Sequence, residues 1–267
     1  MTAPVTVIIA ARNEEGRVAA AVDSAFAAGA AEVIVADGAS EDRTREIAAA
    51  RGATVIHCEA MRSRQFNDGA AAAAHEALIF LHADTVLPPG AASAVADALG
   101  SGAWFGGFRI RFEEPLWRMR CVAFMVNLRT RLTRCPWGDQ AQFITKSRFL
   151  EGGGYREIPL MEDYELAVRM KRTSCHPERS EGSGREEARG MTLEPPHTQV
   201  PRYARDDTRS ARPLILPLTV TTSGRRFLTQ GVVKTTVKNW TIVAAWRAGV
   251  SPDSLRRWYR TTMNDER

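Results

Sequence analysis

Residues 78–85 read LIFLHADT, four apolar residues followed by four that include a histidine and an aspartate. A short apolar run bounded by polar residues is typical of a fully buried strand. Ligands of open α/β sheets bind beyond the carboxyl ends of the strands, so Asp84 is expected to face a crevice. No lysine or arginine lies near it in sequence, and an isolated buried carboxylate is costly. A divalent cation is one expected partner, and a helix cap before the alanine-rich stretch 91–99 is the alternative.

The sequence around this strand alternates between strand and helix patterns. The expected strands are 5–10, 32–36, 54–57 and 78–81. Helices are expected up to about residue 28, through 43–51 with Ser40 as N-cap, and over 68–77. Such alternation predicts an α/β fold with a Rossmann-like, mostly parallel sheet flanked by helices. GxGxxG and P-loop patterns are absent, so hydride transfer with a dinucleotide and P-loop phosphoryl transfer are not supported.

The second half of the chain predicts a less regular series of elements. A strand is expected at 104–112, and an arginine-rich helix at 116–134. The segment 138–140 is expected to open a strand at 141–145, followed by helices at 146–150 and from residue 161. Apolar residues recur at helical spacing in 231–267, with basic residues beside them, at Val233, Val237, Trp240, Val243, Lys234, Lys238 and Arg247.

Composition sets the class of protein. The 267 residues suffice for one sizeable α/β domain, or one domain with an appendage. The net charge of +5 is mild and no basic block is interleaved with aromatic residues, so no nucleic-acid partner is expected. The 4 cysteines show neither CxxC pairs nor a disulfide framework, which favours a reducing cytosol. No signal-peptide pattern and no apolar run of about 20 residues is present, so a cytoplasmic protein is expected.

Residues 174–211 differ from the rest of the chain. Prolines, glycines, serines and charges of both signs leave too little apolar surface to offset the entropy of ordering. Its pieces HPERSEGS (176–183) and RYARDD (202–207) resemble a translated bacterial genomic repeat. The prediction is a disordered insertion without a chemical role.

Four segments are expected to meet at one crevice: ARNE at 11–14, Asp37-Gly38, RSRQFN at 62–67 and HAD at 82–84. Together they resemble a family 2 glycosyltransferase of the GT-A fold. VIIAARNEE resembles the first nucleotide-binding strand of that family, VADGASEDRT the second, and HADT a variant of its DxD motif. MEDYEL (161–166) resembles its acidic catalytic motif. The set looks closest to a small bacterial subfamily of stand-alone transferases, some linked to arsenosugar biosynthesis.

The resemblance implies three parts of the chain. Residues 1–173 and 212–230 would form a single GT-A catalytic domain, interrupted by 174–211, and 231–267 would form a C-terminal amphipathic helical segment. It also implies an inverting, metal-dependent transfer of a sugar from a nucleotide donor, UDP-linked, to a hydroxyl acceptor. Mg²⁺ or Mn²⁺ would stabilise the charge that develops on the leaving diphosphate.

The resemblance assigns roles at the donor site. Asp84 would hold the metal, and His82 replaces the first acid of DxD, where a neutral imidazole can still ligate Mn²⁺. Asp37 would accept a hydrogen bond from the nucleobase; the alternative is that it only forms the turn before Gly38. TTSGRRF (221–227) resembles a basic-aromatic motif over the diphosphate, with Phe227 in place of tryptophan. The donor residues are Ala11, Arg12, Asn13, Glu14, Asp37, Arg64, Asn67, His82, Ala83, Asp84, Arg225 and Arg226. For Arg64 and for the Arg225-Arg226 pair, solvated charges are the alternative.

At the acceptor side, Asp163 is expected to be the base that removes the proton of the acceptor hydroxyl. Adjacent helix residues point to different faces, so one of Glu162 and Asp163 would face the site while the other caps the helix; capping by both is the alternative. The acceptor side is expected to comprise Trp137, Gly138, Asp139, Gln140 and Glu162.

Two other functions remain open from the sequence. A nucleotidyltransferase would carry a glycine- and lysine-rich phosphate loop in its first βα turn, and RNEE (12–15) is not one. An inactive sugar-nucleotide-binding protein, damaged by the insertion or by His82, is the other. The expected partners are a nucleotide sugar and an unidentified hydroxyl acceptor. The basic amphipathic surfaces of 116–134 and 231–267 fit peripheral contact with the inner face of the membrane, internal packing or a homodimer.

Overall fold

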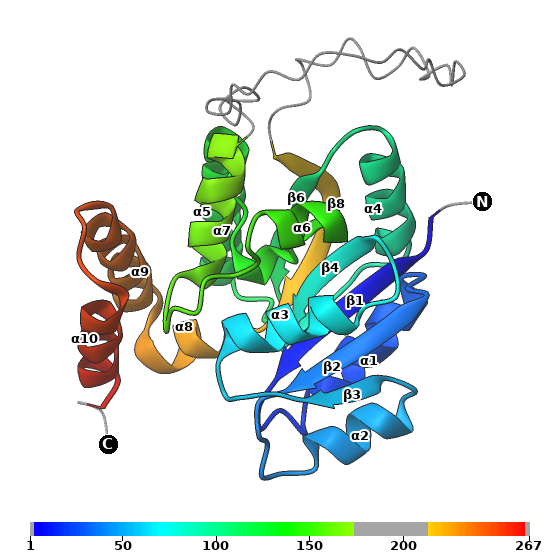
Figure 1. The fold of residues 1–267 in the computed structure, drawn as a ribbon. Helices are drawn as coiled ribbons and strands as arrows, with labels where there is room; N and C mark the ends of the chain where they lie inside the picture. Colours follow the sequence, from blue (N-terminus) through cyan, green and yellow to red (C-terminus); the bar gives the residue numbers. More distant parts are fainter. Residues whose placement is uncertain (1–2, 174–212, 265–267) are drawn as a thin grey trace, which may run out of the picture.

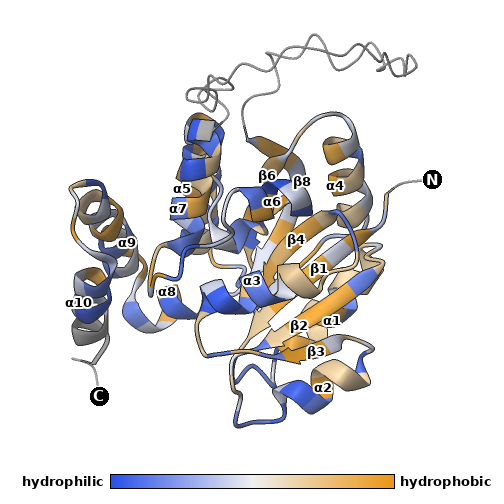
Figure 2. Cartoon of the chain, viewed as in Figure 1, coloured by the Kyte–Doolittle hydropathy of each residue, from blue (hydrophilic) through white to orange (hydrophobic). Residues whose placement is uncertain are grey.

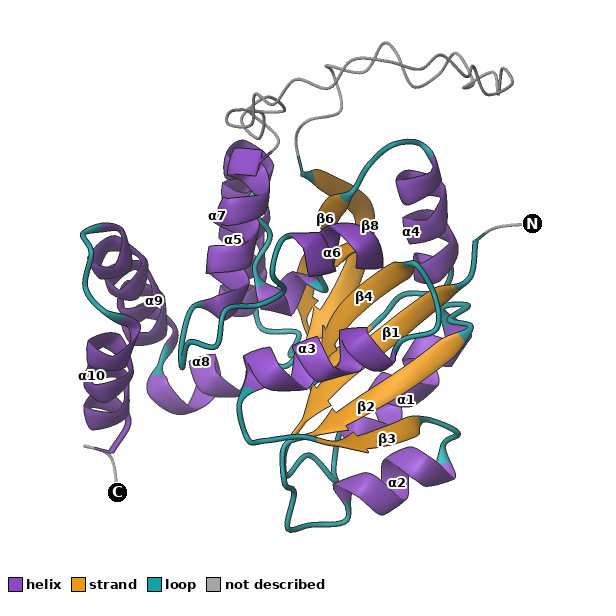
Figure 3. Ribbon diagram, in the orientation of Figure 1, coloured by secondary structure: helices purple, strands orange, loops and turns teal. Residues whose placement is uncertain are grey.

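The computed structural model describes residues 3–173 and 213–264, so the prediction for 174–211 lies outside the described residues. Within them, one eight-stranded sheet has the order β3-β2-β1-β4-β7-β6-β8-β5 (Figures 1 and 3). The strands are β1 Val5–Ala11, β2 Glu32–Asp37, β3 Thr54–His57, β4 Ala77–His82, β5 Thr85–Val86, β6 Phe105–Phe112, β7 Phe143–Thr145 and β8 Leu214–Thr222. The helices are α1 Val18–Ala27, α2 Thr44–Ala50, α3 Arg62–Ala72, α4 Ala91–Gly100, α5 Trp117–Thr133, α6 Lys146–Glu151, α7 Glu162–Thr173, α8 Arg225–Gln230, α9 Val232–Arg247 and α10 Pro252–Asn264, with a 3-10 turn, η1, at Gly138–Gln140.

The first four strands form the parallel half of the sheet. β1 pairs with β2 and β4, and β2 pairs with β3, all in parallel. Alternate residues of β1 and β4 enter cores on opposite faces, because successive side chains of a strand point to opposite sides. Val7 and Ile79 pack with residues of α1 and α4, whereas Ile8 and Phe80 pack with residues of α3, α6 and α7. Burial on both faces explains why these strands are continuously apolar (Figure 2).

The second half of the sheet is mixed and joins distant parts of the chain. β7 runs antiparallel to both β4 and β6, and β8 pairs with β6 in parallel and with β5 antiparallel. Opposite the short β5, Thr222 pairs with Thr85, so the end of β8 lies beside the loop that contains Asp84. The α/β class with a mostly parallel sheet flanked by helices is therefore confirmed.

Several expected boundaries are wrong. The helix expected at 68–77 is α3, and it begins at Arg62, so the expected loop 62–67 is its first turns. Ser40 does not cap α2; its Oγ accepts a hydrogen bond from the backbone N–H of Asn13 at 2.9 Å. The segment 138–140 is a 3-10 turn rather than the start of a strand.

Asp84 is not a helix cap, because α4 begins at Ala91 with Gly90 as its N-cap. The C-terminal helices α9 and α10 stand side by side next to α8, apart from the strands (Figure 1). No helix of the described ranges is long and apolar enough to cross a bilayer.

Candidate active site

The carboxyl ends of three parallel strands lie at one edge of the sheet. The register pairs Ala11 with Asp37 and Ala10 with His82, so the polar residues after these strands gather there. A cavity of about 220 Å³ opens at this edge. Its wall includes many of the expected site residues, namely His82, Asp84, Trp137, Asp139, Glu162, Asp163, Arg225 and Arg226.

Asp163 lies in the wall of the cavity at the first turn of α7. Its Oδ2 accepts a hydrogen bond of 2.7 Å from the backbone N–H of Gly138, and its Oδ1 accepts one of 2.7 Å from the backbone N–H of Tyr164. A Cβ at position 138 would lie 2.8 Å from His82 Nε2 and 3.0 Å from Asp163 Oδ2, so any side chain there would displace these groups. Backbone groups therefore fix the direction of this carboxylate.

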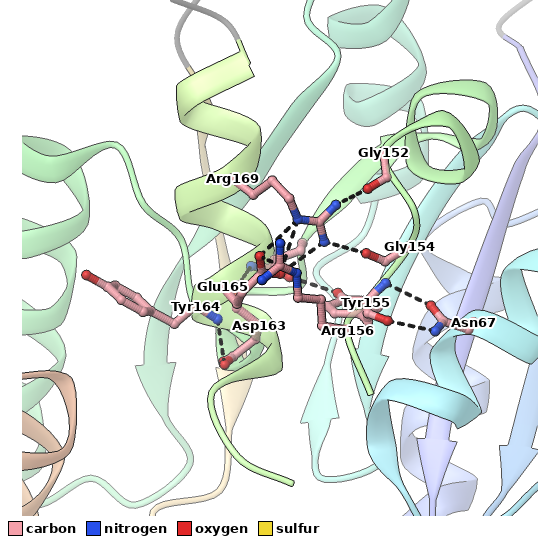
Figure 4. Close-up of polar contacts among 10 residues, drawn as sticks. Asn67, Gly152, Gly154, Tyr155, Arg156, Asp163, Tyr164, Glu165 and Arg169 are labelled. Atoms are coloured by element: carbon pink, nitrogen blue, oxygen red, sulfur yellow. Dashed lines mark hydrogen bonds and ion pairs between the residues drawn. The ribbon is translucent and has the colours of Figure 1, made fainter. Parts of the chain in front are cut away.

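A polar network supports the start of α7 from behind. Gln142 Nε2 donates to the Asp163 carbonyl at 3.0 Å, and Gln142 Oε1 accepts from the Tyr155 hydroxyl at 2.8 Å. The side chain of Asn67 holds both the N–H and the carbonyl of Tyr155, each at 2.8 Å (Figure 4). Arg169 bonds both to Glu165 and to the carbonyls of Gly152 and Gly154 in the loop before α7 (Figure 4). Asn67, an expected donor ligand, is thus engaged with the backbone and does not line the cavity.

Glu162 also lines the cavity, so the structure does not divide the two adjacent carboxylates between a site and a cap. Its side chain is buried, and Oε1 lies 3.2 Å from Arg62 Nε. Burial raises the pKa of Glu162, while the charge of Arg62 opposes that rise.

Sequence reasoning missed Arg62 and chose Arg64. Arg62 lines the cavity, and its Nη1 lies 3.4 Å from His82 Nε2. Arg64 does not line it; its guanidinium pairs with Glu59 and with Glu157, the latter at 2.8 Å. The missed signal is the start of α3. In a helix, residues 62 and 66 share a face while 64 does not, and Phe66 stacks on the His82 ring with 6.1 Å between centroids.

His82 is held as a neutral imidazole. Burial, followed by the charges of Arg62 and Arg226, lowers its pKa well below the ordinary value. Asp84 is not isolated, since its Oδ2 lies 3.5 Å from Arg225 Nη2. The sequence near Asp84 holds no cation; its partner, Arg225, is the first residue of α8 and comes from the segment after β8.

A divalent ion at this site would need ligands from the side chains of the cavity wall. Within residues 3–173 and 213–264, no three histidine, cysteine, aspartate or glutamate side chains lie close enough together to hold one metal ion. Mg²⁺ at phosphate sites takes one or two carboxylates and completes its shell with water and substrate oxygens. Asp84 in the cavity wall supplies one such carboxylate, whereas the imidazole of His82, also in the wall, is a nitrogen donor that Mg²⁺ rarely takes.

Asp37 lies at the same edge, outside the cavity wall. Its side chain is buried, and Oδ2 accepts the backbone N–H of Ser40 at 3.0 Å. Its Oδ1 is buried without a hydrogen-bond partner among the described residues. Buried acceptors are normally satisfied, so Oδ2 of this carboxylate holds the turn while Oδ1 is left to accept a hydrogen bond from a ligand.

The segment 11–14 lies at the same edge of the sheet, between Asp37 and the cavity, and does not line the cavity. Asn13 has a left-handed backbone, with φ 53°, and its Oδ1 accepts the backbone N–H of Glu41 at 2.9 Å. Glu14 pairs with Arg225, which ties the loop after β1 to the segment after β8. Ala11 and Ala83 are buried and Arg12 is exposed.

The acceptor-side residues divide into cavity wall and support. The guanidinium carbon of Arg129 lies 3.6 Å from the centre of the Trp137 ring. Gln140 is fully buried and does not line the cavity; Oε1 accepts from Thr130 Oγ1 at 2.8 Å, and Nε2 donates to the Phe108 carbonyl at 2.9 Å. Gln140 therefore holds the turn that carries its neighbours.

Asp139 lines the cavity, and its Oδ1 is buried without a hydrogen-bond partner in the described chain. Burial, and then the charges of Asp163 and Asp84, raise its pKa to about 6, although Arg129 opposes the shift.

The chain belongs to glycosyl transferase family 2, whose family profile matches residues 6–151. The expected GT-A fold is thereby confirmed. No curated protein matches the chain.

Solved structures are similar to this chain at low sequence identity. Staphylococcus aureus TarS 1-349 in complex with UDP is 16% identical with a TM-score of 0.50, covering 64% of this chain and 55% of that one. Mycobacterium tuberculosis glucosyl-3-phosphoglycerate synthase is 15% identical with a TM-score of 0.49, covering 83% of this chain and 72% of that one. The chain spans about half the length of the TarS 1-349 structures.

Proposed function

We propose that this protein is an inverting glycosyltransferase that moves a sugar from a UDP-linked donor to a hydroxyl acceptor, with Mg²⁺ or Mn²⁺ as cofactor. One observation carries the proposal: a carboxylate oriented by two backbone N–H groups, Asp163, faces the same cavity as three arginines, Arg62, Arg225 and Arg226. Family membership supports a sugar donor, and the TarS structure holds UDP, which makes UDP the nucleotide to test first.

Asp163 would act as the general base. It takes the proton of the acceptor hydroxyl while the hydroxyl oxygen attacks the anomeric carbon of the donor. The bond from that carbon to the diphosphate breaks in the same step, and the nucleoside diphosphate leaves with the electron pair. Attack opposite the leaving group inverts the anomeric centre. The bonds from the N–H groups of Gly138 and Tyr164 keep the carboxylate aimed at the acceptor throughout.

The arginines would stabilise the leaving group. Guanidinium groups form charge-assisted hydrogen bonds with phosphate oxygens, and their value rises where water is excluded. Asp84 and His82 would hold the divalent ion, which when bound supplies Lewis-acid stabilisation of the diphosphate. Asp37, through its unpartnered Oδ1, would accept a hydrogen bond from the nucleobase of the donor.

The experiment is a donor screen by thermal shift with UDP-sugars and Mn²⁺, followed by measurement of UDP release. Stabilisation by a UDP-sugar, with UDP release that depends on an acceptor, is expected. The acceptor screen includes arsenosugar precursors, because the sequence motifs resemble a bacterial subfamily with members linked to arsenosugar biosynthesis. Release of pyrophosphate from a nucleoside triphosphate would instead indicate a nucleotidyltransferase, and binding without turnover across the screen would indicate an inactive binding protein.

A further inference from the structure

Helix α5 has apolar residues on two opposite faces. Its inner face packs against β6 and buries Met119, Val122 and Ala123. The opposite face exposes large apolar side chains, with Trp117 72%, Phe124 64% and Leu132 74% exposed. Met125 and Leu128 are exposed on the same side. At 3.6 residues per turn these five side chains occupy about 100° of the helix circumference. A surface helix with one face in the core normally presents a polar face to water, so this outer apolar stripe needs a partner.

Cations border the outer stripe on both sides. By helical position, Arg120 and Arg131 follow one edge of the stripe and Arg118 the other, and all three are exposed. The helix contains no acidic residue. An apolar stripe bordered by arginines on both sides is the pattern of a helix that lies in the interface of an anionic membrane.

Helix α9, which contacts α5, also exposes an apolar stripe. Val233, Val237 and Trp240 are exposed along one stripe, with Lys234 beside it, and α9 also lacks acidic residues. Two residues expected from sequence in this surface lie elsewhere. Val243 is buried, and Lys238 is buried with its Nζ 3.9 Å from the centre of the Tyr259 ring.

We propose that α5, with α9 beside it, docks this protein on the surface of an anionic lipid bilayer. The apolar stripe enters the boundary between headgroups and acyl chains, and the bordering arginines contact lipid phosphates. The charge of this surface favours an anionic bilayer over a second copy of the chain. Two copies of the chain meeting through this surface would bring cation-bordered, acid-free helices together, whereas an anionic surface is complementary to them. Val126 of α5 and Ile242 of α9 line the cavity from the inner faces of the two helices, so docking leaves the cavity behind these helices, one helix diameter (~10 Å) from the bilayer.

Vesicle flotation tests this proposal with the full chain. We expect flotation with vesicles of phosphatidylcholine and phosphatidylglycerol, none with phosphatidylcholine alone, and release as salt is raised. The double variant Phe124→Ser/Leu132→Ser should lower the partition coefficient by about tenfold or more. Arg118→Glu/Arg131→Glu should lower it by about 25-fold or more, since loss of each cation alone costs about fivefold at an anionic surface.

Matched controls separate the stripe from general surface effects. Leu150→Ser replaces a leucine that is 51% exposed on α6, and Arg43→Glu replaces an exposed arginine near α2; both should float as the unmodified protein does. Absence of lipid-dependent flotation would overturn the proposal. So would a dimer, seen by analytical ultracentrifugation, that Leu132→Ser abolishes while flotation is absent, because a second copy would then cover the stripe.

Discussion

The two halves of the sheet differ in how far apart in sequence their contacts lie. In the parallel half, β1 to β4 and their helices come from one continuous stretch, and Asp37 is fixed by Ser40, three residues away. In the mixed half, the site forms where distant segments meet: the Ser223 N–H donates to the Asp84 carbonyl at 3.1 Å, and Asp163 accepts from Gly138. We infer that the first half provides a preformed nucleotide site and the second provides the reacting groups. Substitutions in the two halves should therefore change different measurements.

The largest expected effect lies in the mixed half. Asp163→Asn should lower kcat by about 10³-fold, because the amide cannot accept the acceptor proton. The dissociation constant of the donor nucleotide, measured by calorimetry, should change little. The matched control is Asp97→Asn, an exposed aspartate on α4, which should keep full activity. Full activity of Asp163→Asn would remove this residue as the base.

Gln140→Ala tests whether an expected acceptor residue is structural. It removes the buried bonds to Thr130, Arg129 and the Phe108 carbonyl and leaves those groups unsatisfied. The free energy of unfolding, measured by chemical denaturation, should fall by about 3 kcal/mol. Unchanged stability with weaker acceptor binding would show instead that Gln140 contacts the acceptor.

Asp37→Asn tests the preformed half. A neutral amide replaces a charge-assisted acceptor, so the affinity for the nucleotide should fall by about tenfold. The value of kcat at saturating donor should be unchanged, the reverse of the result for Asp163. Asp42→Asn, in the same loop, is the control and should bind as the unmodified protein does. If Asp42→Asn weakens binding equally, the loop rather than the Oδ1 atom of Asp37 determines affinity.

The same contrast explains what the sequence could predict. The strands of the parallel half are apolar runs, so their number, their places along the sequence and the polar residues at their ends follow from local pattern, whereas their order within the sheet does not. Asn67 and Gln140 look like site residues because they are polar and lie in motifs, yet they satisfy buried groups of Tyr155 and Phe108 that local sequence does not reveal. The pairing of Asp84 with Arg225 likewise depends on the meeting of two distant segments.

Asp139 makes the mixed half sensitive to pH. Its pKa is raised from 3.8 to about 6, with burial as the first cause. Between these values the folded protein retains a proton that the unfolded chain has released, so stability falls as pH rises through this window. Asp139→Asn lacks this dependence, so its Tm should rise relative to that of the unmodified protein across this window and level off above about pH 6, at a difference of a few degrees. A Tm difference that stays constant across the window would show that Asp139 ionises normally.

The smallest effect should come from Arg64, the arginine that sequence pattern favoured. Its exposed guanidinium pairs with Glu59 and Glu157, and surface ion pairs contribute at most about 1 kcal/mol. Arg64→Ala should therefore leave both stability and donor affinity nearly unchanged. Arg62→Ala, two residues earlier on the same helix, removes a cation from the cavity wall and should weaken donor binding by about tenfold. Calorimetry with a UDP-sugar compares the two variants directly. Equal losses would mean that the first turn of α3 turns toward the donor when it binds, and that the parallel half is less preformed than its packing indicates.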